Sequence, residues 1–213
     1  MSARFELHGI ALSGPTYKVG LTLSFAGEAF DYVHVPLREG AHKQPAYLAK
    51  QRFGQVPLLI DRNNGRHLCQ SAAILEYLAD TLGRFGGATL EERLQIREWL
   101  YWDFDRLAPS VYRTRSAKRG FRQFAPEVLE MYAAEAAAAL KVLDDHLAGR
   151  SWIVGEGVTI ADIDVFGVLA LAGEAEIDLS PYAHVGAWLK RMEALPGAKL
   201  PQNFLPMESK AAA

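Results

Sequence analysis

The chain has 213 residues, of which 50% are hydrophobic and 23% charged, with a net charge of −2 at pH 7. These values are typical of a globular protein that buries a core in one large or two small domains. A charge this close to zero gives no general attraction to nucleic acid or anionic lipid, so neither is expected as a partner. The N-terminus lacks the apolar core of a signal peptide, and no apolar run approaches the roughly 18 residues of a membrane span. The single cysteine, Cys69, excludes an internal disulfide and fits a reducing compartment, so we expect a cytoplasmic protein.

The first part of the chain predicts a β-α-β unit. Residues 4–10 form a short predicted strand, and residues 18–25 an apolar helix that ends at Gly27. Residues 30–35 alternate apolar and polar side chains well enough to be a second strand. Residues 36–52 have mixed polarity and two prolines, which indicates a loop with one short helical segment.

A hairpin and a helix follow. Strand signals over residues 56–60 and 67–69 flank an Asn-Asn-Gly turn, and residues 71–80 predict an amphipathic helix. A β-α-β unit needs a parallel strand pair and a hairpin needs an antiparallel one, so we expect a mixed four-stranded sheet.

A change in composition marks a domain boundary after residue 80. The segment TLGRFGGAT at residues 81–89 has three glycines and little apolar content, so we expect domains at 1–80 and 89–213 with a linker at 81–88. Beyond it the pattern is helical to the end, where the tail ESKAAA is expected to be frayed. An apolar face from Leu90 to Tyr112 predicts one long helix, interrupted by Pro109. Further helices are predicted over residues 127–147, 159–171 and 181–195.

Two features around the hairpin suit a small acidic peptide. Proline is disfavoured inside a central strand, so Pro57 marks an edge or a strand start. If the bond before Pro57 is cis, Val56 turns its N–H and C=O outward, where they could pair with an extended peptide. Ser71 can cap a helix whose N-terminus favours a carboxylate. One surface would then offer unpaired backbone groups for a peptide beside a site for its carboxylate.

Three segments of the chain resemble parts of one known protein family. The segment RFGQVPLLIDRNNGRHLCQSAAILEYLAD, residues 52–80, resembles the thioredoxin-like domain of cytosolic glutathione transferases. Residues 7–37, LHGIALSGPTYKVGLTLSFAGEAFDYVHVPL, resemble that family's first strand, active-site loop, first helix and second strand. Residues 152–170, WIVGEGVTIADIDVFGVLA, resemble the start of its signature helix. Three matches in the right order are far more specific than any one of them.

The resemblance implies a fold, a co-substrate and an assembly. The fold is an α/β thioredoxin-like N-terminal domain followed by an all-α C-terminal domain. The co-substrate is glutathione, no metal is needed, and the protein is a homodimer with its active site near the interface. The loop at Ser13 is similar to that of the bacterial serine-type branch, zeta- or theta-like, whose members are associated with detoxification.

Ser13 lies between the first predicted strand and the first helix. A thiol with a pKa near 8.5 is mostly protonated at neutral pH, and a hydrogen bond to the thiolate favours the charged form. One charge-assisted hydrogen bond contributes roughly 1.5–3 kcal/mol, enough to lower a thiol pKa by one to two units. In serine-type branches of the family the serine at this position activates the sulfur of glutathione in this way, so the resemblance implies that Ser13 is catalytic. The residues alone leave a role as a helix cap or turn open.

Two neighbours compete with Ser13, and one residue type is missing. Thr16 and Tyr17 also carry hydroxyl groups, and we expect Tyr17 on the first turns of the helix as a structural or substrate-pocket residue. No cysteine occupies residues 8–18. Family branches that form mixed disulfides with glutathione use a cysteine there, so that chemistry is not expected.

The resemblance assigns glutathione contacts to residues around the hairpin. Val56 and Pro57 match the family's cis-proline site, whose preceding residue pairs its backbone with the cysteinyl part of glutathione. Gln70 and Ser71 match the pair that holds the γ-glutamyl end. Many relatives have an acid in place of Gln70, so the ammonium group could instead be recognised by Asp103, in a helix that lines the dimer cleft of similar proteins.

Further contacts are assigned to loops. Gln55 lies where some branches carry a lysine for the glycyl carboxylate, and His42 and Lys43 lie in a loop that supplies such contacts in related proteins. Each of these has an ordinary exposed loop residue as its alternative. Tyr112 is expected near the substrate pocket.

Other residues are expected to be structural. Thr159 and Asp162 form a predicted capping box at the start of a core helix, so replacing Asp162 should cost folding rather than chemistry. Cys69 is expected to be a buried core thiol. A basic cluster is expected in a solvated interhelical loop, with a possible preference for acidic co-substrates; its members are Arg113, Arg115, Lys118, Arg119 and Arg122.

The sequence therefore predicts a glutathione transferase that activates the thiol for attack on a small, largely apolar electrophile. One alternative is a glutathione-dependent isomerase of the zeta (maleylacetoacetate isomerase) kind, although the loop at Ser13 lacks that branch's Ser-Ser-Cys. Another alternative is a non-catalytic binding or adaptor domain of the same fold. Peroxidase or reductase activity toward hydroperoxides and small disulfides also stays open.

Overall fold

The computed structural model describes residues 2–206, and its contacts divide the chain into two compact units. Among the described residues, the first unit runs to Leu82 and also includes Pro196–Pro206, and the second is Gly83–Leu195. The tail ESKAAA lies outside the described residues.

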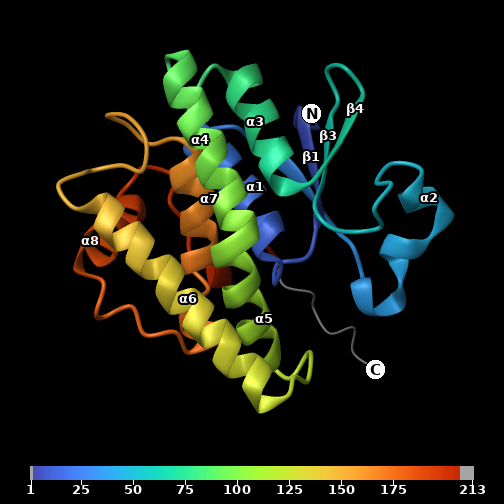
Figure 1. Cartoon of the computed structure of the whole chain (residues 1–213). Helices are drawn as coiled ribbons and strands as arrows, with labels where there is room; N and C mark the ends of the chain where they lie inside the picture. The colour runs from blue at the N-terminus through green and yellow to red at the C-terminus, as the bar shows by residue number, and fades with distance from the viewer. Residues whose placement is uncertain (1, 207–213) are drawn as a thin grey trace. The chain divides into compact units, whose positions relative to one another are not determined.

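The first unit contains a four-stranded sheet with helices (Figure 1). Its spatial order is β2-β1-β3-β4, with β1 parallel to β2 and antiparallel to β3, and β3 antiparallel to β4. The predicted mixed sheet is therefore confirmed. The elements in chain order are β1 (Phe5–Gly9), α1 (Gly14–Ala26), β2 (Phe30–His34), η1 (Leu37–Glu39), η2 (Ala41–Lys43), α2 (Pro45–Leu48), β3 (Leu58–Asp61), β4 (Arg66–Cys69), α3 (Ser71–Leu82) and η5 (Pro201–Asn203).

Helix α1 begins four residues before the predicted start at Lys18. Ser13 is its N-cap, and Pro15 lies in the first turn, where its fixed φ suits a helix and its missing N–H costs nothing. The helix is buried nearly all round, so it lacks the polar face that would have marked this start in the sequence. A Cβ at Gly9 would lie 2.2 Å from Thr16 Cγ2, so only glycine at the end of β1 lets this first turn approach the strand.

The C-terminal segment packs on the first unit. The ring of Phe204 contacts Tyr17 and Phe30 edge-on, with centroid separations of 6.0 and 6.1 Å. Tyr17 donates a hydrogen bond to the carbonyl of Lys199 at 2.7 Å, and Ser24 donates to Gly197. The sequence-based division assigned this segment to the helical domain, whereas its described part belongs with the sheet.

All the regular elements of the second unit, residues 83–195, are helices, as predicted, and α5 and α6 run side by side in it (Figure 1). The predicted interruption near Pro109 is a π-helical stretch, η3, that leads directly into α5, with Pro109 in the first turn. The elements are α4 (Leu90–Trp102), η3 (Asp103–Leu107), α5 (Ala108–Lys118), α6 (Pro126–Leu147), α7 (Ile160–Leu169), η4 (Gly173–Ala175) and α8 (Ala183–Glu193).

Helix α7 is the core of the second unit, and every one of its residues is buried. Thr159 occupies the N-cap, and its backbone N–H donates to Asp162 Oδ2 at 2.9 Å in a capping box. Asp162 also accepts hydrogen bonds from the backbone N–H of Ile153 and the indole N–H of Trp188, each at 2.9 Å. A single carboxylate thus joins α7 to the chain before it and to α8.

Candidate functional site

Three loops meet at one edge of the sheet in the first unit. The strand register pairs His8 with Leu58, and Leu58 with Cys69. The carboxyl ends of β1 and β4 therefore lie beside the amino end of β3. Consequently Ser13, which follows β1, the Val56–Pro57 pair, which precedes β3, and Gln70–Ser71, which follows β4, are brought to the same edge.

Ser13 is partly exposed and is the N-cap of α1. Its Oγ accepts a hydrogen bond from the backbone N–H of Thr16 at 3.2 Å, as an N-cap does. This bond occupies a lone pair of Oγ and leaves the hydroxyl hydrogen free to donate. The cap and the predicted catalytic role are therefore compatible.

The two competing hydroxyl groups are buried. Thr16 is fully buried, and its hydroxyl has no hydrogen-bond partner within residues 2–206. Tyr17 is a core residue whose hydroxyl donates to the carbonyl of Lys199. Of these three residues, only Ser13 is partly exposed.

The Val56–Pro57 peptide bond is cis. Val56 lies before β3, and within the described chain its backbone N–H and C=O make no hydrogen bond. Both groups are therefore available to an extended ligand that lies along this edge.

Gln70 and Ser71 form the start of α3. The sequence suggested Ser71 as the helix cap, whereas in the structure Gln70 takes that position. The carbonyl of Gln70 accepts from the N–H of Ile74 at 3.0 Å, so Gln70 occupies the capping position, with a left-handed φ of 68°, and Ser71 is the first helical residue. The Ser71 hydroxyl makes no hydrogen bond to any other described residue. This hydroxyl and the first-turn N–H groups of α3 are therefore available to an anion.

A second glutamine joins this site from the loop before β3. The Gln70 amide donates to Gln55 Oε1 at 3.1 Å, and the carbonyl of Gln55 accepts from the Tyr47 hydroxyl at 2.8 Å. Burial raises the pKa of Tyr47 to about 12, so its hydroxyl stays protonated even in moderately alkaline solution. The sequence gives no indication of this role for Tyr47, because a tyrosine in a segment of mixed polarity carries no signal of its own.

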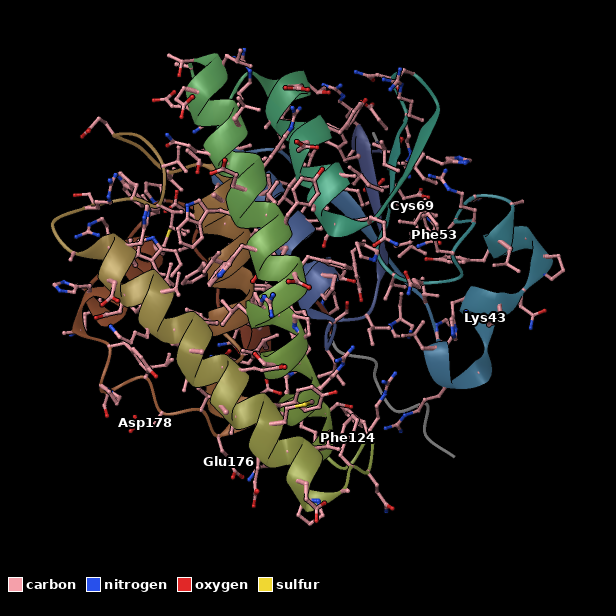
Figure 2. The ribbon with its side chains drawn as sticks, viewed as in Figure 1. Lys43, Phe53, Cys69, Phe124, Glu176 and Asp178 are labelled. Atoms are coloured by element: carbon pink, nitrogen blue, oxygen red, sulfur yellow. The ribbon has the colours of Figure 1, made fainter. Side chains whose placement is uncertain are left out.

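The loop with His42 reaches the same stretch of chain. Lys43, labelled in Figure 2, donates to the carbonyl of Gly54 at 2.8 Å. Gly54 has a left-handed φ of 58°, and a Cβ there would lie 3.1 Å from the carbonyl oxygen of His42. His42 is partly buried, and its Nδ1 has no hydrogen-bond partner among residues 2–206.

Two expectations about exposure were wrong. Cys69 is partly exposed rather than buried, because β4 is the edge strand; its thiol lies 3.8 Å from the carbonyl of Lys50, and burial raises its pKa (Figure 2). The basic cluster is not a solvated loop, since most of it belongs to α5. There Arg115 is buried and, with Arg119, forms ion pairs with Glu174.

The remaining predicted residues belong to the second unit. Asp103 lies at the start of η3 and is buried, so it is not a solvated carboxylate. Tyr112 on α5 is partly buried. Among residues 2–206, no group of three or more histidines, cysteines and acids is arranged to hold a metal ion. No helix within that range is long and apolar enough to cross a membrane.

Comparisons with known proteins identify the family. The family model for the N-terminal domain of glutathione S-transferases matches residues 6–80, and the model for the C-terminal domain matches residues 120–196. The chain belongs to the glutathione S-transferase family. Its first unit is thus the thioredoxin-like domain, and it is a glutathione transferase by family, with glutathione as co-substrate.

Individual relatives agree with this assignment. Glutathione S-transferase GST-4.5 from Xanthomonas campestris is 33% identical over 71% of this chain and 76% of that protein. The disulfide-bond oxidoreductase YfcG of Escherichia coli is 28% identical over 84% of this chain and 86% of that protein. A crystal structure of a glutathione S-transferase from Xanthobacter autotrophicus Py2 is 33% identical, with a TM-score of 0.85 over 92% of this chain and 96% of that one.

Proposed function

We propose that this glutathione transferase binds glutathione along the edge formed by Ser13, Val56–Pro57 and Gln70–Ser71, and activates its thiol for attack on a small, largely apolar electrophile. The observation that carries the proposal is the strand register, which gathers a hydroxyl donor, an unpaired backbone segment and an open helix N-terminus at one edge. These are the groups that a thiol, a peptide backbone and a carboxylate each require.

Each part of glutathione has a partner at this edge. The free N–H and C=O of Val56 pair with the cysteinyl backbone, as a strand edge pairs with a peptide. The Ser71 hydroxyl and the first-turn N–H groups of α3 receive the γ-glutamyl α-carboxylate. Gln70 contacts the same end of the ligand, while Gln55 and His42 approach the glycyl carboxylate.

The Ser13 hydroxyl then acts on the sulfur. It donates a hydrogen bond to the thiolate while its oxygen keeps the bond from the Thr16 N–H, which polarises the O–H toward the sulfur. The thiol proton leaves to solvent, and the thiolate forms a C–S bond with the electrophile. A leaving group departs with the electron pair of its bond, or, in an addition, the new carbanion takes a proton from water.

Isothermal titration with glutathione tests the binding half of the proposal. We expect one site per chain, and Ser71→Ala should weaken the affinity about tenfold, because the carboxylate loses a charge-assisted hydrogen bond. Ser180→Ala, which removes an exposed serine of the second unit, is the matched control. Absence of binding at millimolar glutathione would favour the adaptor alternative.

A second reaction is favoured by one relative. The Escherichia coli protein named disulfide-bond oxidoreductase is 28% identical to this chain. The same activated thiolate could attack a disulfide sulfur, forming a mixed disulfide with glutathione and releasing a thiolate. A substrate panel of an activated aryl halide, a small disulfide and an acidic cis-enedione separates transferase, reductase and isomerase activity.

We further propose a homodimer. Large apolar side chains on α4 and η3 lie on one helical face and are exposed, namely Leu90, Leu94, Tyr101 and Phe104. An exposed apolar face of this length is typical of an interaction surface.

A further inference from the structure

The second unit contains a groove that the proposed glutathione chemistry does not use. It encloses about 410 Å³ between α5, α6 and the chain that follows η4. This volume is within the range of small-molecule sites, roughly 300–1,000 Å³. All of its lining residues belong to this unit: Thr114, Lys118, Leu129, Glu130, Ala133, Ala136, Ala137, Leu140, Ala175, Glu176, Ile177, Asp178 and Tyr182.

The floor of the groove is apolar because α6 is rich in alanine. Ala133, Ala136 and Ala137 have the i, i+3, i+4 spacing of one helical face, and each ends in a methyl group. Leu129 and Leu140 extend the same face at its two ends. Larger side chains at the three alanine positions would fill the space, so the composition of α6 creates the hollow.

A buried hydroxyl borders this apolar floor. Thr114 on α5 lines the groove and is 8% exposed. Its Oγ1 has no hydrogen-bond partner within residues 2–206. The hydroxyl oxygen itself is closed to solvent, so Thr114 borders the groove without offering it a polar group.

The charges at the rim favour a cation. Three carboxylates line the groove against one lysine, and that lysine, Lys118, is already ion-paired with Glu176. Asp178 accepts hydrogen bonds only from Ser180, and Glu130 has no cationic partner in the described chain. Figure 2 shows Glu176 and Asp178 on the segment that runs along α6. Two carboxylates therefore remain without a neutralising charge at the mouth of an apolar groove.

We propose that this groove binds a small amphipathic amine, with its apolar body on the alanine face of α6 and its ammonium group at the carboxylate-bearing rim, to which Glu130 and Asp178 belong. The buried part of the ligand supplies contact area, and the two carboxylates select the positive charge. An anionic or neutral molecule of the same size lacks this second contribution.

The test uses monodansylcadaverine, which joins an apolar fluorophore to a primary ammonium, and its N-acetylated form, which lacks the charge. With the full chain we expect a saturable rise in fluorescence at one site per chain for the amine. The acetylated form should bind about tenfold more weakly, the change expected for losing two exposed ion pairs. Equal binding of the two dyes would overturn the proposal.

Paired variants locate the site. Ala137→Phe should fill the groove and abolish binding, whereas Ala134→Phe, exposed on the same helix outside the groove, should leave it unchanged. The double variant Glu130→Gln with Asp178→Asn should remove the preference for the amine, while Glu135→Gln should keep it. Unchanged binding by Ala137→Phe, or displacement of the dye by glutathione, would place the dye elsewhere and refute the assignment.

Circular dichroism of each variant checks the fold, and glutathione titration of each keeps this test separate from that of the proposed function.

Discussion

The carboxylate of Asp162 accepts four hydrogen bonds, from Ile153, Trp188 and both the backbone and the hydroxyl of Thr159. Burial raises the pKa of this carboxyl group, and the four donors oppose that effect. Removing the carboxylate would leave several buried donors without an acceptor, and each such group costs about 1–3 kcal/mol. Its role is therefore to hold the start of α7, far along the chain from the residues proposed to bind glutathione.

Asp162→Ala should lower the free energy of unfolding by about 3 kcal/mol or more, measured by denaturant titration. Asp145→Ala is the control, because Asp145 is an exposed member of an i,i+4 pair with Lys141 and should cost less than about 0.5 kcal/mol. Wild-type stability of Asp162→Ala would mean that the capping box contributes nothing to the fold.

Asp61 is the last residue of β3, at the end of the sheet opposite the candidate site. It is fully buried and accepts a two-pronged hydrogen bond from Arg4, at 3.1 and 2.7 Å, and another from Tyr77 at 2.7 Å. The Arg4 guanidinium, helped by Tyr77 and against the effect of burial, lowers the pKa of this carboxyl group below its usual 3.8. The charged form is thus favoured in the folded protein.

The sign of the pH effect follows from this shift. Because the folded pKa is below the unfolded one, the stabilisation from Asp61 is complete above pH values near 4 and is lost as the pH falls through the folded pKa. Asp61→Asn should be less stable than wild type at neutral pH, and the difference should shrink between about pH 5 and pH 2. Urea unfolding across this range measures it, with Asp80→Asn, an exposed change on α3, as control. A difference that stays constant with pH would contradict the assignment.

At the scale of an element, α4 and η3 expose four large apolar side chains on one face. Tyr101 is 71% and Phe104 72% exposed, and both lie on the face that begins with Leu90 and Leu94. The sequence identified this face from its spacing, but spacing cannot say whether a neighbour in the same chain or a second chain covers it. The continuity of the face through the π-helical turn makes it one surface rather than four separate residues.

Tyr101→Lys combined with Phe104→Glu should convert a dimer to a monomer, because charged groups would have to be buried at the interface. Light scattering after size exclusion measures the mass. Val142→Lys, which places a charge on an exposed apolar residue of α6, is the matched control and should remain dimeric. A monomeric wild-type protein at micromolar concentration would contradict the proposed assembly.

For the whole molecule, the sequence predicted the features that rest on local chemistry. The Val-Pro strand start, the Asn-Asn-Gly turn and the Thr159–Asp162 pair each depend on residues close together in the chain. What it did not predict depends on distant partners. The packing of Phe204 on Tyr17, the burial of Arg115 against Glu174 and the partial exposure of Cys69 on an edge strand are all set by residues that sequence spacing does not connect.

The candidate site divides in the same way. The three loops were identified from their motifs, but the register that brings them to one edge became visible only in the sheet. The contribution of Tyr47, which supports Gln55, and the capping position of Gln70 both arise from backbone conformations that side-chain patterns do not encode.

The pKa of glutathione's thiol in the bound state tests the central claim most directly. Ultraviolet difference absorbance of the thiolate, followed against pH, should give a pKa about one to two units below that of free glutathione for the wild type. Ser13→Ala should return it to the free value with affinity changed only a few-fold, and Ser13→Thr, which keeps both the cap and the hydroxyl, should restore the low value. An unchanged pKa in Ser13→Ala would remove Ser13 from the chemistry and leave it as a helix cap alone.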